Sequence, residues 1–318
     1  MKVFWSVADV GDETKNAALA IGNFDGVHLG HQALIRKARE LSSKASVLTF
    51  TPHPETVLHS DAGHFYLTSD QQKIELFAKL GVANAIIHRI DKDFLKKKPE
   101  DFVEHILLKR LKVKYVVVGE DFTFGYRAMG DISVLKALSE RFGFITLVVP
   151  PVIINGQRIS SSIIRQDLRS GELDLARAML GRPYSLLGVV EGGQKKGGIL
   201  GFATANITPP LGFGLKTGVY ATVVRVGDGD AFQDYLSVTN VGFRPTVTTK
   251  KTLVVESHCL DQDLELYGQV IKVFFIHRLR DEQAFPSITV LQEQVEKDCQ
   301  AVRQMYHSPA QARFRVRD

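Results

Sequence analysis

Residues Gly22 to His31 bring three glycines, a carboxylate and two imidazoles together, in the order Gly-Asn-Phe-Asp-Gly-Val-His-Leu-Gly-His. Glycine lets a backbone approach a ligand closely, and His28 and His31 are spaced so that both can face one group. Such a pair can hold phosphate oxygens and offset the charge that develops during in-line displacement at phosphorus. A His-x-x-His pair alone is equally typical of a metal site or of two surface histidines. The neighbouring glycines and Asp25 favour a phosphate site.

The residues on both sides of this segment predict a strand, a turn and a helix. Ala17 to Ile21 is a short apolar run, as in a buried parallel strand, and Gln32 to Leu41 has apolar residues at helical spacing. The start of such a helix presents N–H groups and the positive end of its dipole to an anion. No Gly-Lys-Ser or Gly-Lys-Thr occurs in the chain, which argues against an ordinary P-loop.

Three further polar segments follow predicted strands. In Thr51 to Pro54, two prolines fix the turn around His53, although this can also be a rigid loop. Gly119 to Gly125 places aromatic side chains beside a carboxylate, which suits either a flat ring stacked beside a hydrogen-bonded ribose or base, or a small hydrophobic cluster. Arg158 to Arg165 places serines at a helix start between two arginines, which suits a triphosphate clamp or a simple helix cap.

The order of elements predicts an α/β protein of two domains. Strand and helix patterns alternate through the first half, with Thr68 expected to begin a capped helix, and this indicates a Rossmann-like parallel sheet with helices on both faces. After Pro183 the pattern changes to short β-rich runs, which indicate an antiparallel barrel, and then to a last helix at about 289–305. At 318 residues the chain is long enough for two domains, predicted as 1–183 and 184–318.

The second half has polar residues of its own that could act on phosphates. Gly192 to Gly198 is a loop rich in glycine and lysine that could cradle phosphate oxygens. Thr204 and Asn206 point to the same side of an extended segment, so they can share one Mg²⁺ with a phosphate, unless they only serve a turn. Glu256 is the candidate base, although a lone glutamate on a strand is usually just exposed.

The segment Gly22 to His31 resembles the His-x-Gly-His signature of the nucleotidyltransferase superfamily, as found in bacterial bifunctional riboflavin kinase/FAD synthetases. The other segments resemble that family's remaining motifs in the same order, and the second half resembles its riboflavin kinase domain, a six-stranded barrel. The resemblance implies catalytic roles for His28, His31 and Glu256, flavin contacts from His53, Pro54 and Phe124, and Mg²⁺ ligands at Thr204 and Asn206. It implies ATP contacts from Gly22, Asn23, Phe24, Asp25, Gly26, Gly30, Asp121, Arg158, Ser161, Ser162, Arg165, Lys195 and Lys196.

The resemblance implies an enzyme that phosphorylates riboflavin with ATP and then joins FMN to AMP, giving FAD and pyrophosphate, with Mg²⁺ in both steps. The chain departs from the family at Ala203, where a proline is usual, and at Gly198, where an arginine is usual. Losing the proline costs roughly 0.4 to 1 kcal/mol of preorganisation. The alternatives are an FAD synthetase with a weak or inactive kinase domain, a nucleotidyltransferase for another phosphorylated substrate, and a flavin-binding sensor without turnover.

Composition indicates which partners to expect. The net charge is only +5, the lysines are dispersed and no nucleic-acid reader motif occurs, so we expect small-molecule substrates and no nucleic-acid partner. No stretch is apolar enough to span a bilayer and the start lacks the features of a signal peptide, so we expect no membrane partner and a cytoplasmic location. Nothing points to an obligate protein partner. Cys259 and Cys299 are expected to be reduced thiols.

Overall fold

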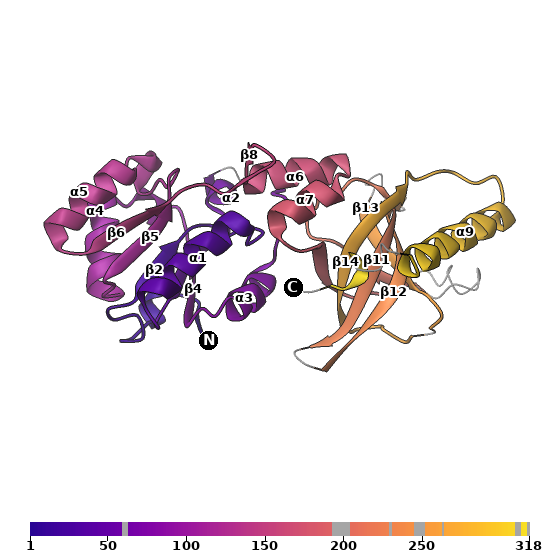
Figure 1. The fold of residues 1–318 in the computed structure, drawn as a ribbon, viewed down its shortest axis with the longest axis horizontal. Helices are drawn as coiled ribbons and strands as arrows, with labels where there is room; N and C mark the ends of the chain where they lie inside the picture. Colours follow the sequence, from indigo (N-terminus) through magenta and orange to yellow (C-terminus); the bar gives the residue numbers. More distant parts are fainter. Residues whose placement is uncertain are drawn as a thin grey trace. The chain divides into compact units, whose positions relative to one another are not determined.

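The chain divides into two compact units, Met1–Ser161 and Ser162–Asp318, each described by itself below (Figure 1). The computed structural model describes residues 1–58, 63–192, 204–228, 231–244, 252–262, 264–308 and 313–316. The division lies before the predicted boundary at Pro183. Helices α6 (Ser161–Ser170) and α7 (Leu173–Leu180) account for the difference, because the buried face of α7 packs on strands of the second unit.

The first unit is built on a parallel sheet with the strand order β1-β4-β3-β2-β5-β6 in the described residues. Its strands are β1 (Lys2–Phe4), β2 (Ala18–Ile21), β3 (Ser46–Thr51), β4 (Asn84–Arg89), β5 (Tyr115–Gly119) and β6 (Ile145–Val149). The chain runs outward from β2 through β3 to β4 and then returns to β5 on the other side of β2. In such sheets ligands bind beyond the carboxyl ends of the strands at this switch point. The predicted Rossmann-like fold is confirmed.

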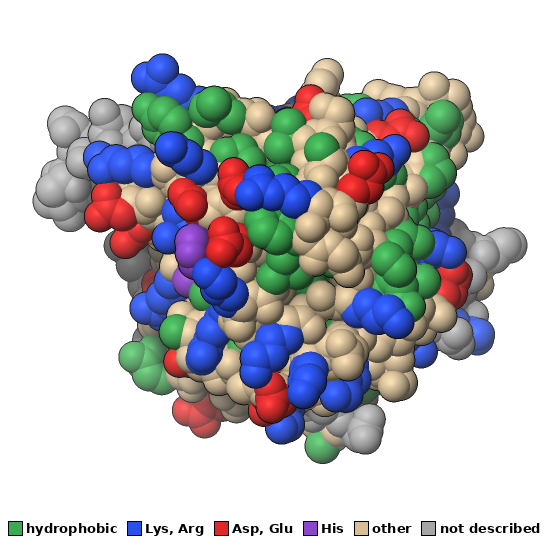
Figure 2. Space-filling model, turned by 90° about the vertical axis from the view of Figure 1, so that its left-hand side faces the viewer, with side chains coloured by type: hydrophobic (Ala, Val, Ile, Leu, Met, Phe, Trp, Pro, Cys, Tyr) green, Lys and Arg blue, Asp and Glu red, His purple; other side chains and the backbone are tan. Residues whose placement is uncertain are grey.

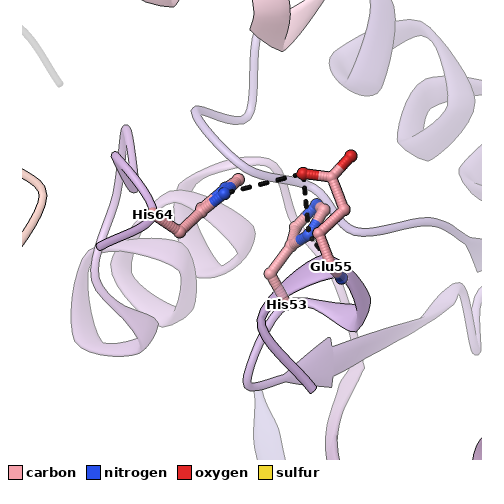
Figure 3. A group of neighbouring side chains, drawn as sticks. All are labelled: His53, Glu55 and His64. Carbon is pink, nitrogen blue, oxygen red and sulfur yellow. Dashed lines mark hydrogen bonds and ion pairs between the residues drawn. The ribbon is translucent and has the colours of Figure 1, made fainter. Parts of the chain in front are cut away.

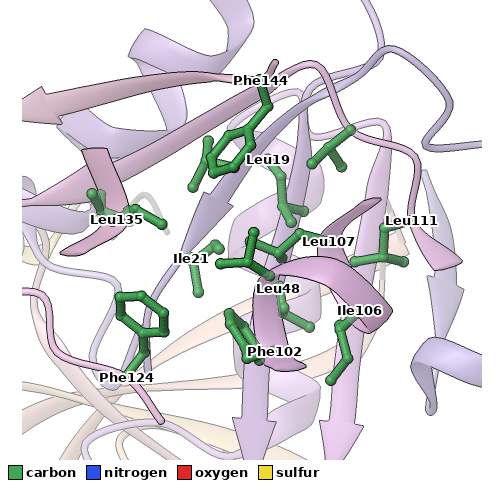
Figure 4. Close-up of a cluster of buried hydrophobic side chains, with 14 of the residues drawn as sticks. Leu19, Ile21, Leu48, Phe102, Ile106, Leu107, Leu111, Phe124, Leu135 and Phe144 are labelled. Atoms are coloured by element: carbon green, nitrogen blue, oxygen red, sulfur yellow. The ribbon is translucent and has the colours of Figure 1, made fainter. Parts of the chain in front are cut away.

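Helices cover both faces of this sheet, which explains why β2 is apolar throughout. Leu19 and Ile21 face a hydrophobic cluster formed with η3 (Phe102–Arg110) and α5 (Ile132–Phe142), and Figure 4 shows these side chains. Ala18 and Ala20 face the opposite cluster, formed with α1 (Leu29–Leu41) and α3 (Asp70–Lys79). Burial on both faces holds β2 and the turn after it in place.

One helix of the first unit is a π-helix, and another begins one residue later than predicted. The segment after α4 (Pro99–Asp101) continues as the π-helix η3, in which the Leu111 N–H donates to the Ile106 carbonyl five residues earlier, at 2.9 Å. Helix α3 is capped by Ser69 and not by Thr68, with a capping box to Gln72. The Thr68 hydroxyl instead accepts the N–H of Gly26 at 2.9 Å. The remaining short elements are η1 (Val7–Asp9), α2 (Pro54–Leu58), η2 (Phe94–Lys96), η4 (Tyr126–Ala128), β7 (Ile153–Ile154) and β8 (Gln157–Arg158).

The second unit is an antiparallel barrel with a terminal helix, as predicted. The strands lie in the order β10-β13-β12-β11-β14-β9, and a bridge between Glu191 and Asn206 joins the two edges of the sheet. Helix α9 (Ile288–Tyr306) packs Cys299 and Val302 against the outside of the sheet. The strands are β9 (Tyr184–Val189), β10 (Ala205–Ile207), β11 (Gly218–Asp228), β12 (Ala231–Arg244), β13 (Thr252–Cys259) and β14 (Val270–Arg280).

A row of hydroxyl groups crosses the buried side of this sheet. Thr222 contacts Ser237 at 2.8 Å and Thr239 at 2.7 Å, and Thr239 contacts Ser257 at 2.8 Å. All four side chains are buried. Each hydroxyl is therefore satisfied by another across the strands, which avoids the cost of burying an unpaired polar group.

Basic and acidic side chains are mixed on the surface. On the face in Figure 2, Lys and Arg side chains are scattered among acidic and apolar ones. Within the described residues, no helix has the length and apolar character needed to cross a membrane.

Candidate active sites

The turn from Gly22 to His28 leaves the carboxyl end of β2 at the switch point of the sheet. Phe24 and Val27 are buried and have positive φ angles of 50° and 41°. This conformation is a genuine outlier for a β-branched residue and costs of order 1–3 kcal/mol at each such position. Strain of this kind persists only where the surroundings hold the backbone, as they do here at a site predicted to be functional.

Hydrogen bonds from a neighbouring segment hold this turn. The carboxylate of Asp25, only 1% exposed, accepts the N–H groups of Leu67 and Thr68 at 2.9 and 3.1 Å. The Ser161 hydroxyl donates to the backbone carbonyl of Asp25 at 2.9 Å. Sequence analysis assigned both side chains to ATP. In the structure Asp25 and Ser161 brace the turn, and their contacts with ATP remain predictions.

His28 and His31 lie at the start of α1 with their rings stacked at 3.6 Å and 17°. Nδ1 of His28 accepts the N–H of His31 at 3.3 Å, so the neutral ring carries its proton on Nε2. A Cβ atom at Gly30 would lie 3.1 Å from the His28 ring, which explains the glycine there. Because Nδ1 of His28 accepts the capping hydrogen bond, the Nε2–H group is the donor that the neutral ring presents.

His31 is held in the neutral form. Its burial lowers its pKa well below the ordinary value of 6.5, and the positive charge of a protonated His28 or of Lys73 would lower it further. The ring also packs against Phe24 at 5.1 Å. Sequence analysis allowed either a protonated or a donating imidazole, and the structure favours a neutral hydrogen-bonding group at His31.

Two other predicted residues meet each other in the first unit. Asp121, just after β5, forms an ion pair with Arg158 at 2.8 Å, and both side chains are largely exposed. Exposed pairs contribute little to stability, so the partners can separate at small cost when a phosphate offers Arg158 a stronger acceptor. Ser162 and Arg165 lie on α6 in the second unit.

The residues that were predicted to contact the flavin lie in different environments. Phe124 is 8% exposed and packs on Phe122 and Phe102 in the core, with ring centroids at 5.4 and 5.8 Å. Its predicted place beside the flavin remains a prediction. His53 follows β3, beside Pro54 at the start of α2, and its Nε2 lies 3.0 Å from the side-chain amide of Asn23. His53 is thus connected to the turn that carries the two stacked imidazoles.

The barrel register brings the second unit's polar residues together. In β10, β13 and β12, Asn206 lies opposite Glu256, and Glu256 lies opposite Asn240. Cross-strand partners share one face of a sheet, and Thr204 directly precedes β10. Lys195, Lys196, Gly198 and Ala203 lie outside the described residues. No role was assigned to Asn240 from the sequence, because its pairing depends on strand register.

A cavity of about 520 Å³ adjoins this row of residues. Thr204 lines it, and so do Ser257 and Cys259, which point to the opposite side of β13 from Glu256. Glu256 is therefore placed beside Asn206 and not among the residues that line the cavity. The remaining lining residues are Val190, Glu191, Gly192, Ala205, Gln262, Leu264, Glu265, Leu266 and Tyr267.

Comparison with known proteins gives the same two-part division. The FAD synthetase family profile matches residues 11–163, and the riboflavin kinase profile matches residues 180–306. The chain is 38% identical to the bifunctional riboflavin kinase/FMN adenylyltransferase of Haemophilus influenzae, over 92% of this chain and 96% of that enzyme. The enzyme of the same name from Escherichia coli K12 is 34% identical, over 92% and 93% of the two chains.

A solved structure covers both units. The crystal structure of a macrolide-efflux protein from Streptococcus pneumoniae superimposes with a TM-score of 0.81 at 26% identity. The match covers 95% of this chain and 98% of that one.

Proposed function

Because this chain belongs to the bifunctional riboflavin kinase/FMN adenylyltransferase family, we propose that its first unit carries the adenylyltransferase site and its second unit the kinase site. The enzyme phosphorylates riboflavin with ATP to FMN and transfers AMP from ATP to FMN, giving FAD and pyrophosphate. The alternatives of an inactive kinase domain and of a sensor without turnover are not favoured, because both family profiles match.

The stacked pair of His28 and His31 is the observation that carries the adenylyltransferase assignment. In this reaction an oxygen of the FMN phosphate attacks the α-phosphorus of ATP, and the bond to the β-phosphate oxygen breaks with its electron pair leaving on pyrophosphate. His28 Nε2–H at the N-terminus of α1 donates to a phosphate oxygen whose charge grows during this displacement. Neutral His31 supports the same oxygens as a hydrogen-bonding group. Arg158 exchanges Asp121 for a phosphate when ATP binds.

The row of Thr204, Asn206, Glu256 and Asn240 supports the kinase assignment. A threonine hydroxyl and an asparagine amide are the oxygen ligands that Mg²⁺ accepts, and the amide nitrogen of Asn206 donates to the Thr204 carbonyl at 3.3 Å. These two residues therefore fit Mg²⁺, which supplies charge neutralisation on the ATP phosphates when bound. Glu256 accepts the proton of the riboflavin 5′-hydroxyl as that oxygen attacks the γ-phosphorus.

Measuring the kinase rate and the adenylyltransferase rate on the same variant tests both assignments. Purified protein is incubated with riboflavin or FMN, ATP and Mg²⁺, and FMN and FAD are resolved by chromatography. We expect Glu256→Gln to slow riboflavin phosphorylation by about 10²- to 10⁴-fold, because glutamine cannot accept the proton, while adenylylation of added FMN is unchanged. Glu296→Gln, on α9 beside Arg303, is the matched control. A normal kinase rate in Glu256→Gln would exclude Glu256 as the base.

The proposal also includes the binding partners and the location of the enzyme. Its partners are riboflavin, FMN and ATP, and neither reaction calls for a nucleic acid, a membrane or a second protein. A cytoplasmic location remains a prediction.

A further inference from the structure

Three side chains of the first unit meet at a point that the two reactions do not use together. His53 follows β3, Glu55 lies in the first turn of α2, and His64 lies beyond residues 59–62. Figure 3 shows the imidazoles of His53 and His64 beside each other, with the Glu55 carboxylate reaching toward both. One ligand atom from each of the three lies within 4.8 Å of the others.

The distances do not fit an ordinary hydrogen-bonded cluster. One Glu55 carboxylate oxygen lies 3.6 Å from Nδ1 of His64 and 3.9 Å from Nδ1 of His53, and both separations exceed a hydrogen bond. Nδ1 of His53 uses its lone pair to accept the backbone N–H of Glu55 in a long contact of 3.3 Å, which a bound metal ion would replace. A cation held between the Glu55 carboxylate and the two imidazoles would be attracted by the carboxylate charge and by the ring nitrogens.

The surroundings position these groups as outer partners position metal ligands. The Tyr66 hydroxyl accepts the backbone N–H of His53 at 3.0 Å, and the Tyr66 ring packs edge-on against the His64 ring with centroids 4.7 Å apart. Nε2 of His53 lies 3.0 Å from the side-chain amide nitrogen of Asn23. Partners on the second ring nitrogen orient metal-binding histidines in this way.

We propose that His53, Glu55 and His64 bind a divalent transition-metal ion, Zn²⁺ in the first instance. Two imidazole nitrogens and one carboxylate are the donor set of three-ligand zinc sites, whereas Mg²⁺ prefers oxygen alone. The ligand atoms of a tetrahedral zinc site lie about 3.3 Å apart, given bonds of about 2.0–2.1 Å. The cluster reaches that spacing by a rotation of one stacked imidazole and by a shift of Glu55, whose side chain is 68% exposed.

The two cysteines are poor competitors for the ion. Cys259 and Cys299 belong to the second unit and are buried there. Burial raises the pKa of both thiols to about 11, so they are protonated at neutral pH. A thiolate is the form that binds metal.

The test uses the full chain after chelator treatment and dialysis. Zn²⁺ is titrated by calorimetry, and Co²⁺ is titrated in parallel, because tetrahedral Co²⁺ gives intense visible absorption. We expect one equivalent of each metal, no competition by Mg²⁺, and an affinity loss of at least about 10- to 100-fold in His64→Ala and in Glu55→Gln. His105→Ala, an exposed histidine on η3, is the matched control and should bind as the original chain does.

Two outcomes would overturn the site. One is the absence of stoichiometric Zn²⁺ binding by the original chain. The other is unchanged affinity in both variants, which would place the ion elsewhere. Circular dichroism of the metal-free variants separates lost ligands from lost folding, and Glu55→Gln keeps the test valid should His64→Ala unfold, because Glu55 is largely exposed.

Discussion

At the scale of single residues, His28 has two functions that a mutation can separate. Its Nδ1 caps α1, and its Nε2–H is the proposed donor to a phosphate oxygen. We expect His28→Ala to lower FAD formation from added FMN by at least about a hundredfold, which is the range found for losing one donor to a developing charge. The rate of FMN formation from riboflavin should survive. Chromatography of both products on the same purified variant measures the two rates.

A capping role alone would give a different result. His28→Asn retains a side-chain oxygen for the N-cap, and N-cap loss costs only about 1 kcal/mol. If His28→Asn restores the adenylylation rate that His28→Ala has lost, the imidazole serves the helix and not the transferred phosphate. His105→Ala, which removes an exposed histidine, is the control and should leave the adenylylation rate unchanged.

His31 makes stability depend on pH. Its folded pKa lies well below 6.5, so in the window below about 6.5 the unfolded chain binds a proton that the folded chain does not. The free energy of unfolding should therefore fall as the pH is lowered through this window, by up to about 1.4 kcal/mol per pH unit from this one group. Thermal unfolding at a series of pH values should show a shallower dependence in His31→Gln. An equal slope in both proteins would contradict the burial argument, and His105→Gln controls for an exposed imidazole.

At the scale of elements, the hydroxyl row ties three strands of the barrel together. Thr239 of β12 lies between Thr222 of β11 and Ser257 of β13. We expect Thr239→Val to lower the free energy of unfolding of the second unit by about 1–3 kcal/mol, because it leaves two buried hydroxyls short of a partner while the side-chain volume is kept. Calorimetry of the whole chain measures this effect. Thr252→Val, at the exposed start of β13, is the control and should change the free energy of unfolding little. If Thr239→Val unfolds at the same temperature as the original chain, the hydroxyl row does not stabilise the barrel.

At the scale of the whole molecule, the two units should work separately. A fragment of residues 1–183 contains every described adenylyltransferase residue but also α7, whose buried face packs on β9 and β14 of the second unit. We expect fragments 1–183 and 1–171 both to convert FMN to FAD, with 1–171 the more soluble because it lacks that apolar face while it keeps Arg165. Solubility and FAD formation are measured for both fragments. A folded but inactive 1–171 would show that the adenylyltransferase site needs the second unit.

Local patterns in the sequence were enough to predict much of this protein. The strand, glycine turn and helix around His28 are encoded in one continuous segment, residues 18–41, and the alternation of elements predicted a parallel sheet followed by an antiparallel barrel. These features depend on local backbone geometry and on side-chain periodicity, both of which can be read along the chain. A shared role for Thr204 and Asn206 follows from the same kind of local pattern and remains a prediction.

Only the tertiary structure decided features that depend on distant contacts. Asp25 binds the segment at Leu67 and Phe124 packs in the core, and neither set of partners is near in sequence. The row of Asn206, Glu256 and Asn240 depends on strand register, and His64 reaches His53 only because the chain folds back. The division after Ser161 depends on which surface buries α7. The burial of a side chain, the register of paired strands and the contacts between distant segments are set by the packing of the whole unit. A local sequence pattern does not contain this information.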